Sequence, residues 1–171
     1  MPQQTPWIEK SFTDPQDKLE IAISFPQGCR RIKSQGDGAG KSEPWSAHFL
    51  VQISYLVNNV QTDWGTLAGM SVVVGSKDAF VLRKTYIGRP TTSISSLNSG
   101  LYFRNDAPFT VRVRRISIQL TAETESSDPD WRYIYTSVLQ TITGYRNGIK
   151  PITDPPNTKL AKTALSVKST K

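Results

Sequence analysis

The chain has 171 residues, of which 37% are hydrophobic, and this length is typical of one domain with a single core. Its apolar runs reach only three or four residues, far short of the roughly 20 that a transmembrane helix needs. One cysteine and one histidine exclude a disulfide framework and a zinc site built on several thiolates, while a net charge of +7 favours polyanionic partners.

The first 17 residues contain three prolines and no periodic apolar pattern, which predicts a flexible N-terminal arm. They also lack the basic and apolar regions of a secretory signal. Three apolar residues stand alone in the arm and are candidates for docking onto a neighbouring subunit: Trp7, Ile8 and Phe12. The arm therefore predicts self-association.

Period-two alternation of apolar side chains predicts a strand over Lys18–Phe25, followed by a polar, glycine-rich, basic loop over residues 29–44. Residues 46–60 fit both a strand and one face of a helix, and their β-branched and aromatic content favours the strand. Further strands are predicted over Thr66–Val74, Ala79–Ile87 and Leu101–Arg104, with a long loop at 88–100.

The segment Phe109–Thr121 reads as a strand whose apolar positions change phase at Arg114 and Arg115. Phe109, Val111 and Val113 are odd-numbered, whereas the later apolar positions are even-numbered. A β-bulge at the two arginines would keep both halves on the core side. This arrangement would place Arg112, Arg114 and Arg115 together on the polar face.

A helix is predicted next, with Asp128 as its N-cap, Pro129 at its first position and Gly144 at its end. Its apolar positions have helical spacing: Trp131, Tyr135, Val138 and Ile142. Residues 148–171 read as a disordered basic tail. The predicted fold class is α+β and β-rich: an antiparallel sheet or sandwich core over residues 18–147, one C-terminal helix and flexible termini.

Two candidates for catalysis are rejected. Gly36–Ser42 resembles a phosphate-binding loop, but Gln35 replaces its first glycine and Pro44 disrupts the helix that should follow. Cys29 lies beside Arg30, and with His48 it would need a third group to orient the pair. We therefore expect no enzyme, no cofactor, no metal and no small-molecule substrate.

Basic residues cluster between positions 83 and 115, where Asp106 is the only acid. If the strands that carry them are neighbours, several share one face and form a polyanion-binding patch. The predicted members are Arg83, Lys84, Arg89, Arg104, Arg112, Arg114 and Arg115.

A small, basic, cysteine-poor chain with a β-rich core and an N-terminal arm resembles the matrix proteins of negative-strand RNA viruses. Its size is similar to that of the short matrix proteins of plant rhabdoviruses. The segment from Thr143 to Pro151 is similar to the Tyr-Arg-rich close of bornavirus-type matrix proteins. The sequence departs from animal rhabdovirus matrix proteins because Pro155–Thr158 does not supply a Pro-Pro-x-Tyr motif. No functional residue carries over.

The expected function is that of a non-enzymatic viral structural protein of matrix type. It would assemble with itself and bridge an anionic lipid surface and a nucleoprotein or RNA, without sequence specificity. The expected location is the virion and the host cytoplasm, peripheral to a membrane. The alternative is a jelly-roll capsid protein that binds genomic nucleic acid. Its usual basic N-terminal arm is missing, because residues 1–17 sum to −2 (Lys10 against Glu9, Asp14 and Asp17).

Overall fold

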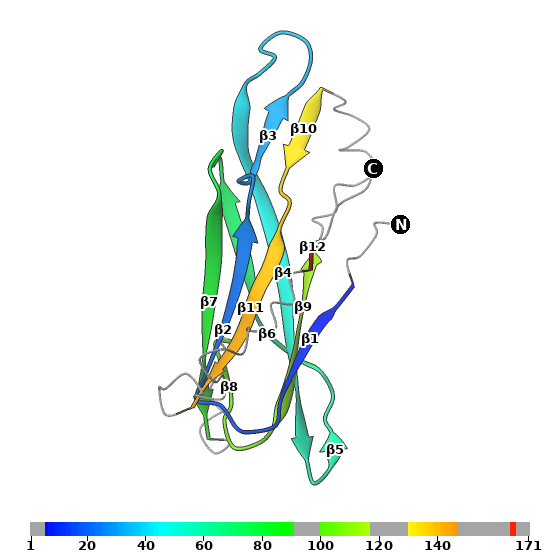
Figure 1. Cartoon of the computed structure of the whole chain (residues 1–171). Coiled ribbons are helices and arrows are strands. Elements are labelled where there is room, and N and C mark those ends of the chain that lie inside the picture. The colour runs from blue at the N-terminus through cyan, green and yellow to red at the C-terminus, as the bar shows by residue number, and fades with distance from the viewer. Residues whose placement is uncertain (1–5, 91–99, 117–129, 147–164, 167–171) are drawn as a thin grey trace.

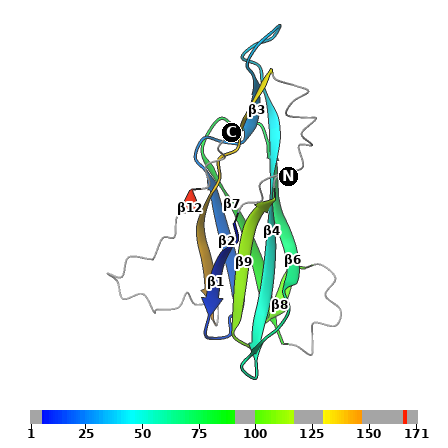
Figure 2. The same cartoon turned by 90° about the vertical axis from the view of Figure 1, so that its right-hand side faces the viewer.

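The computed structural model describes residues 6–90, 100–116, 130–146 and 165–166, and every regular element in them is a β-strand. Two sheets lie face to face in an elongated sandwich (Figure 1; Figure 2). No helix capable of crossing a bilayer is found in these residues. The strands are β1 (Ile8–Phe12), β2 (Lys18–Phe25), β3 (Arg30–Lys33), β4 (Ser42–Val57), β5 (Val60–Gln61), β6 (Gly65–Val74), β7 (Phe80–Arg89), β8 (Tyr102–Arg104), β9 (Phe109–Ile116), β10 (Trp131–Ile134), β11 (Val138–Tyr145) and β12 (Leu165–Ser166).

The described strands divide into two sheets. The first follows the order β1-β9-β4-β3-β10, with β5 and β6 also paired to β4, and the second follows β12-β11-β2-β7-β8. All pairs are antiparallel except β7–β8. Strand β4 has 16 residues, so its first residues extend past the sandwich and pair with β3, which pairs with β10. We call these three paired segments the apical extension (Figure 1).

Alternating side chains of both sheets form the core between them. On β2, Leu19, Ile21 and Phe25 are fully buried, as the period-two pattern predicts. The aromatic rings of the two sheets meet directly: Phe25 lies 6.2 Å from Phe49 in edge-to-face contact, measured between ring centroids. The strand expected over residues 18–25 is confirmed in β2, and the strand expected over residues 46–60 is confirmed in β4 as far as Val57, where a turn at Asn58 and Asn59 leads into β5.

The predicted C-terminal helix is wrong, and the α+β class with it, because Trp131–Ile134 and Val138–Tyr145 are strands. A register shift between Leu139 and Thr141 inserts one extra residue in β11. Consequently Leu139 and Ile142 both face the core although they are three positions apart. Val138 and Ile142, two of the residues from which the helix was predicted, lie on opposite faces of β11, because Val138 is opposite Ser24 and Ile142 is opposite Ile21. Asp128 and Pro129, the predicted helix start, lie outside the described residues.

Two segments expected to lack regular structure contain strands. Ile8–Phe12 of the predicted arm pairs with β9 over five residue pairs, so this part is a strand of the first sheet. Residues 30–33, expected in a loop, pair with both β4 and β10. In the predicted tail, Leu165–Ser166 pairs with β11, and the other tail residues lie outside the described ranges. The backbone hydrogen bonds of neighbouring strands compensate for the weak local patterns.

The predicted bulge at Arg114 and Arg115 is also wrong. β9 pairs with β4 in unbroken register, with Arg114 opposite Leu50 and Arg115 opposite Phe49. The bulge of this sheet lies instead in β6, where two residues oppose Leu50. Gly69 fits there because a Cβ atom would lie 2.8 Å from the carbonyl oxygen of Phe49.

Candidate polyanion-binding site

The seven predicted polyanion-binding residues do not form one patch, because both sheets contribute to them. On the second sheet, Arg83 forms an ion pair with Glu20 at 3.1 Å and Arg104 forms one with Asp106 at 2.6 Å. The guanidinium of Arg89 lies 5.2 Å from the ring of Tyr102. Lys84 lies opposite the buried Ile21, so it belongs to the inner face of β7.

Arg112 and Arg114 lie on the outer face of the first sheet and contact aromatic side chains. The Nε and Nη2 atoms of Arg112 donate to Oε1 of Gln52 at 2.9 and 2.7 Å. Its guanidinium lies 4.2 Å from the ring of Trp7 and 3.9 Å from that of Trp64, and Arg114 lies 4.4 Å from Trp7. These arginines are therefore already engaged within the chain, in cation–π contacts.

Arg115 does not join them, because it lies opposite the buried Phe49 and so faces inward. Its Nη1 donates to the carbonyl oxygen of Tyr135 at 3.4 Å, and its guanidinium lies 4.8 Å from that residue's ring. Burial lowers the pKa of Arg115. The expected group of three arginines on one polar face is therefore wrong.

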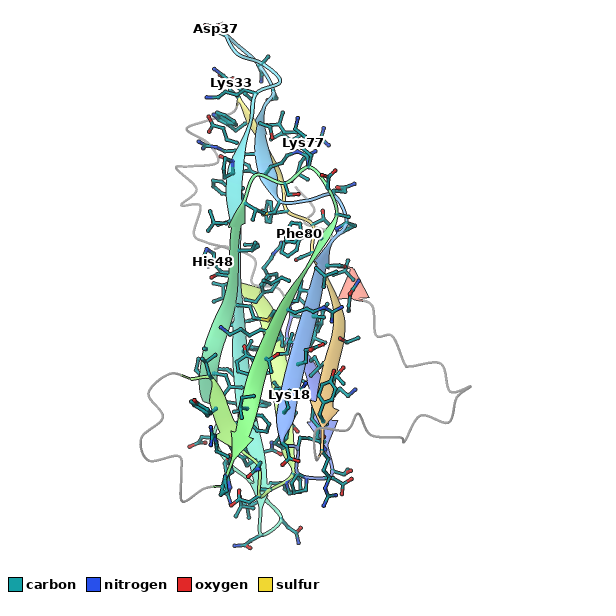
Figure 3. The ribbon with its side chains drawn as sticks, turned by 90° about the vertical axis from the view of Figure 1, so that its left-hand side faces the viewer. Lys18, Lys33, Asp37, His48, Lys77 and Phe80 are labelled. Atoms are coloured by element: carbon teal, nitrogen blue, oxygen red, sulfur yellow. The ribbon has the colours of Figure 1, made fainter. Side chains whose placement is uncertain are left out.

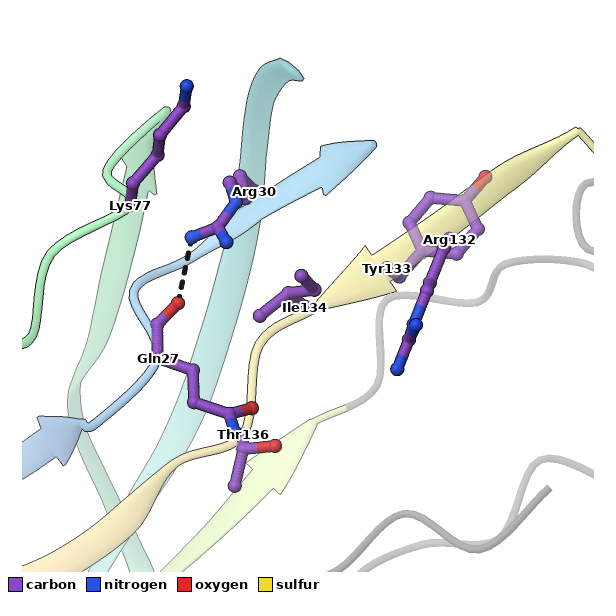
Figure 4. Close-up of a pocket in the computed structure, with 7 residues that line it drawn as sticks. All are labelled: Gln27, Arg30, Lys77, Arg132, Tyr133, Ile134 and Thr136. Atoms are coloured by element: carbon purple, nitrogen blue, oxygen red, sulfur yellow. Dashed lines mark hydrogen bonds between the residues drawn. The ribbon is translucent and has the colours of Figure 1, made fainter. Parts of the chain in front are cut away.

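Cations do gather where the apical extension joins the sandwich. A cavity of about 500 Å³ opens there, and we call it the apical cavity (Figure 4). None of its described lining residues is acidic. The lining consists of Gln27, Arg30, Lys77, Arg132, Tyr133, Ile134 and Thr136.

Two turns bring Arg30 and Lys77 together. Cys29 forms an isolated antiparallel bridge with Ser76, which joins the β2–β3 turn to the β6–β7 turn. Gly28 has a φ of 73°, and a Cβ atom there would overlap the carbonyl oxygen of Ser76. Nη1 of Arg30 donates to the carbonyl oxygens of Gln27 at 2.9 Å and Ser76 at 3.3 Å. These two hydrogen bonds hold the guanidinium of Arg30 beside both turns.

Strand β10 supplies the opposite wall of the cavity. Its register places Ile134 opposite Arg30 and Arg132 opposite Ile32, so these side chains share one face of the apical extension. Lys77 and Arg132 are exposed, and neither forms an ion pair with any described residue. The Nε of Arg30 is buried without a hydrogen-bond partner in the described part of the chain.

On the other face of the apical extension, two cations share one carboxylate. Arg31 donates through Nη2 to Glu43 at 2.6 Å, and Lys41 pairs with the same carboxylate at 2.8 Å. These contacts lower the pKa of Glu43, with the hydrogen bond from Lys41 as the largest cause. Arg31 also lies 4.3 Å from the ring of Trp131. Positive charge therefore lies on both faces of the apical extension, and the described lining of the apical cavity contains no carboxylate that could pair with its cations.

The rejected catalytic candidates have structural roles. The Gly36–Ser42 loop joins β3 to β4, so a strand follows it where a phosphate-binding loop requires a helix; Figure 3 shows Lys33 and Asp37 near its tip. Cys29 is buried, its Sγ donates to the carbonyl oxygen of Trp45 at 3.4 Å, and burial raises its pKa. The described residues contain no group of three metal-ligating side chains.

The predicted self-association residues contact their own chain. The ring of Phe12 lies 4.9 Å from that of Phe109, and Ile8 also packs against the core. Trp7 covers Arg112 and Arg114. These contacts hold β1 against β9.

Sequence reasoning missed the apical cavity because Arg30, Lys77 and Arg132 come from three distant segments, each with acids nearby in the sequence. No linear pattern unites them. Three cations around one concave surface can bind phosphate oxygens by charge and by hydrogen bonds. Comparison with known protein families and with curated proteins finds no match to this sequence.

Proposed function

We propose that this chain is a non-enzymatic structural protein of matrix type, which assembles with itself and binds the phosphate groups of polyanions. Its partners would be an anionic lipid surface and a nucleoprotein or RNA, and its location would be the virion and the host cytoplasm, peripheral to a membrane. The observation that carries the proposal is the apical cavity, whose described lining includes Arg30, Lys77 and Arg132 and no acidic residue. The resemblance to viral matrix proteins supplies the biological setting.

The geometry favours phosphate over a neutral ligand. Arg30 is held in place by two backbone carbonyls, while Lys77 and Arg132 have freely exposed side chains that can adjust to an anion. A polymer or a membrane presents many phosphate groups close together, so neighbouring phosphates can bind to different cations of the same cavity. Each cation near an anionic surface contributes about 1 kcal/mol. We therefore expect affinity that decreases steeply with salt and ignores base sequence.

The test compares two charge-matched variants of the full chain. K77Q/R132Q removes the two exposed cations of the cavity, and K10Q/R146Q removes two exposed cations elsewhere. Both variants lower the net charge by two and leave Arg30 and its turn intact. Binding is measured by filter retention of single-stranded RNA and by co-sedimentation with phosphatidylserine vesicles, over a salt series.

We expect K77Q/R132Q to weaken binding about 30-fold at low salt, which corresponds to about 1 kcal/mol for each cation. K10Q/R146Q should weaken it much less. The RNA and vesicle arms identify which polyanion the site prefers. Equal losses in the two variants would show that net charge alone drives binding and would contradict the assignment to the cavity.

A second candidate, a shell-forming capsid protein, is favoured by one observation. The described residues form two facing sheets with no helix, which is the architecture of capsid sandwiches (Figure 2). Electron microscopy of the purified chain separates the two candidates. Filaments, sheets or helical arrays support the matrix function, and closed shells of uniform diameter support the capsid.

A further inference from the structure

Among the described residues, strand β1 forms strand-to-strand hydrogen bonds with one neighbouring strand only. Within the described part of the chain it pairs with β9 alone, from Ile8 opposite Val113 to Phe12 opposite Phe109. It therefore forms an edge of the first sheet, next to β9 in Figure 2. Glu9, Lys10 and Ser11 are exposed. β1 can separate from β9 without breaking any other strand pair that the structure describes.

The surface under β1 is built for this strand. Phe12 and Ile8 pack against the core, and the ring of Phe12 lies 4.9 Å from the buried Phe109. On the outer face, Trp7 stacks on Arg112, and Oε1 of Glu9 lies 3.8 Å from Nη1 of the same arginine. Without β1, this surface would expose apolar side chains and the unpaired backbone edge of β9. A copy of β1 from another chain would satisfy all of these groups equally well.

The connector between β1 and β2 has a fixed end and an exposed end. At the fixed end, the backbone N–H of Asp17 donates to the carbonyl oxygen of Tyr145 at 2.7 Å. The carboxylate of Asp17 accepts a hydrogen bond from Nδ2 of Asn105 at 3.2 Å. Gln16 is buried, and its Oε1 has no hydrogen-bond partner among the described residues. Thr13 and Asp14 are exposed. A change of backbone angles at Thr13–Pro15 would therefore swing β1 outward while β2 stays in place.

We propose that copies of this chain exchange β1 when they assemble, so that β1 of one copy pairs with β9 of a second copy. The inference rests on the self-assembly in the proposed function, and it names the partner and the contact. Exchange remakes the same pairs and the same Phe12, Trp7 and Glu9 contacts, so it costs little beyond the entropy of association. Protein concentration then decides between the closed and the exchanged forms.

A disulfide between β1 and β9 tests the exchange in the full-length chain. The hydroxyl oxygens of Ser11 and Thr110 lie 2.8 Å apart on the exposed face, so cysteines at these positions would be placed to form a disulfide. S11C chains and T110C chains are mixed in equal amounts, assembled and oxidised with oxidised glutathione. The peptide that links position 11 to position 110 is then identified by mass spectrometry. The S11C/T110C double variant, kept dilute, shows that the bond forms within one closed chain.

Exchange predicts an 11–110 link between different chains in the mixed sample. Because the two variants are equally abundant and pair at random, about half of the exchanged pairs should contain one S11C chain and one T110C chain. The yield of this link should increase with protein concentration. Assemblies that form normally, seen by light scattering, but contain no interchain 11–110 link would overturn the exchange and leave self-assembly standing. A mixture that stays monomeric at every concentration would overturn the self-assembly and the exchange together.

Discussion

Tyr86 shows how one side chain joins the two sheets. It is fully buried on β7 of the second sheet, and its hydroxyl donates to the carbonyl oxygen of Ala68 at 2.6 Å. Ala68 lies in the bulge of β6, where the ladder to β4 is interrupted. The hydroxyl thus satisfies a carbonyl at the bulge, and burial raises the pKa of Tyr86.

Replacing Tyr86 with phenylalanine should destabilise the chain by about 1–2 kcal/mol near neutral pH, because the Ala68 carbonyl loses its buried donor. The free energy of unfolding is measured in urea for both chains. Because folding raises the pKa of Tyr86, its contribution is complete below the unfolded pKa of about 10 and is lost as the pH rises above it.

The gap between wild type and Y86F should therefore narrow by about 1.4 kcal/mol for each pH unit above about 10. Cys29 and Tyr55 also have pKa values raised by burial, but both are present in the two chains, so their effects cancel in the difference. A gap that stays constant up to pH 11 would contradict a buried, neutral Tyr86.

The helix was predicted from four apolar residues that the structure divides between β10, β11 and the segment joining them: Trp131, Tyr135, Val138 and Ile142. Leu139 and Ile142 have helical spacing, and only the exposed extra residue between them, Gln140, reconciles that spacing with a strand. A change of phase in the apolar pattern does not locate a bulge, because the one at Arg114 and Arg115 coincides with an unbroken register. β2, by contrast, alternates without interruption, and its predicted bounds match the structure. Regular strands were predictable from periodicity, whereas bulged and short edge strands depend on neighbours that are distant in sequence.

β1 offers a test of whether an N-terminal strand belongs to the core. Replacing Phe12 with alanine should lower the free energy of unfolding by about 2 kcal/mol, because the ring packs on Phe109. Replacing the exposed Lys10 of the same strand with alanine should change it by about 0.5 kcal/mol or less. Both are measured by urea unfolding at low protein concentration. Equal, negligible effects would mean that β1 is detached from the sandwich in solution.

For the whole molecule, the positions of the charged side chains limit which surface can bind a polyanion more than the net charge does. The net charge of +7 is visible in the composition, but most of the predicted arginines are engaged by Glu20, Asp106, Gln52 or aromatic rings. The cations that line the apical cavity come from two strands, β3 and β10, and from the β6–β7 turn, which only the folded chain brings together. The candidate site was therefore beyond the reach of sequence patterns.

Amide chemical shifts of the full-length chain can locate the surface at which a polyanion binds, and we propose that this surface is the apical cavity. The ¹⁵N-labelled protein is titrated with a short single-stranded RNA at low salt. We expect the largest shifts at Gln27–Arg30, at Ser76 and Lys77, and at Arg132–Thr136. Largest shifts at Arg112 and Arg114, or at Arg89 and Arg104, with the cavity amides unchanged, would contradict it.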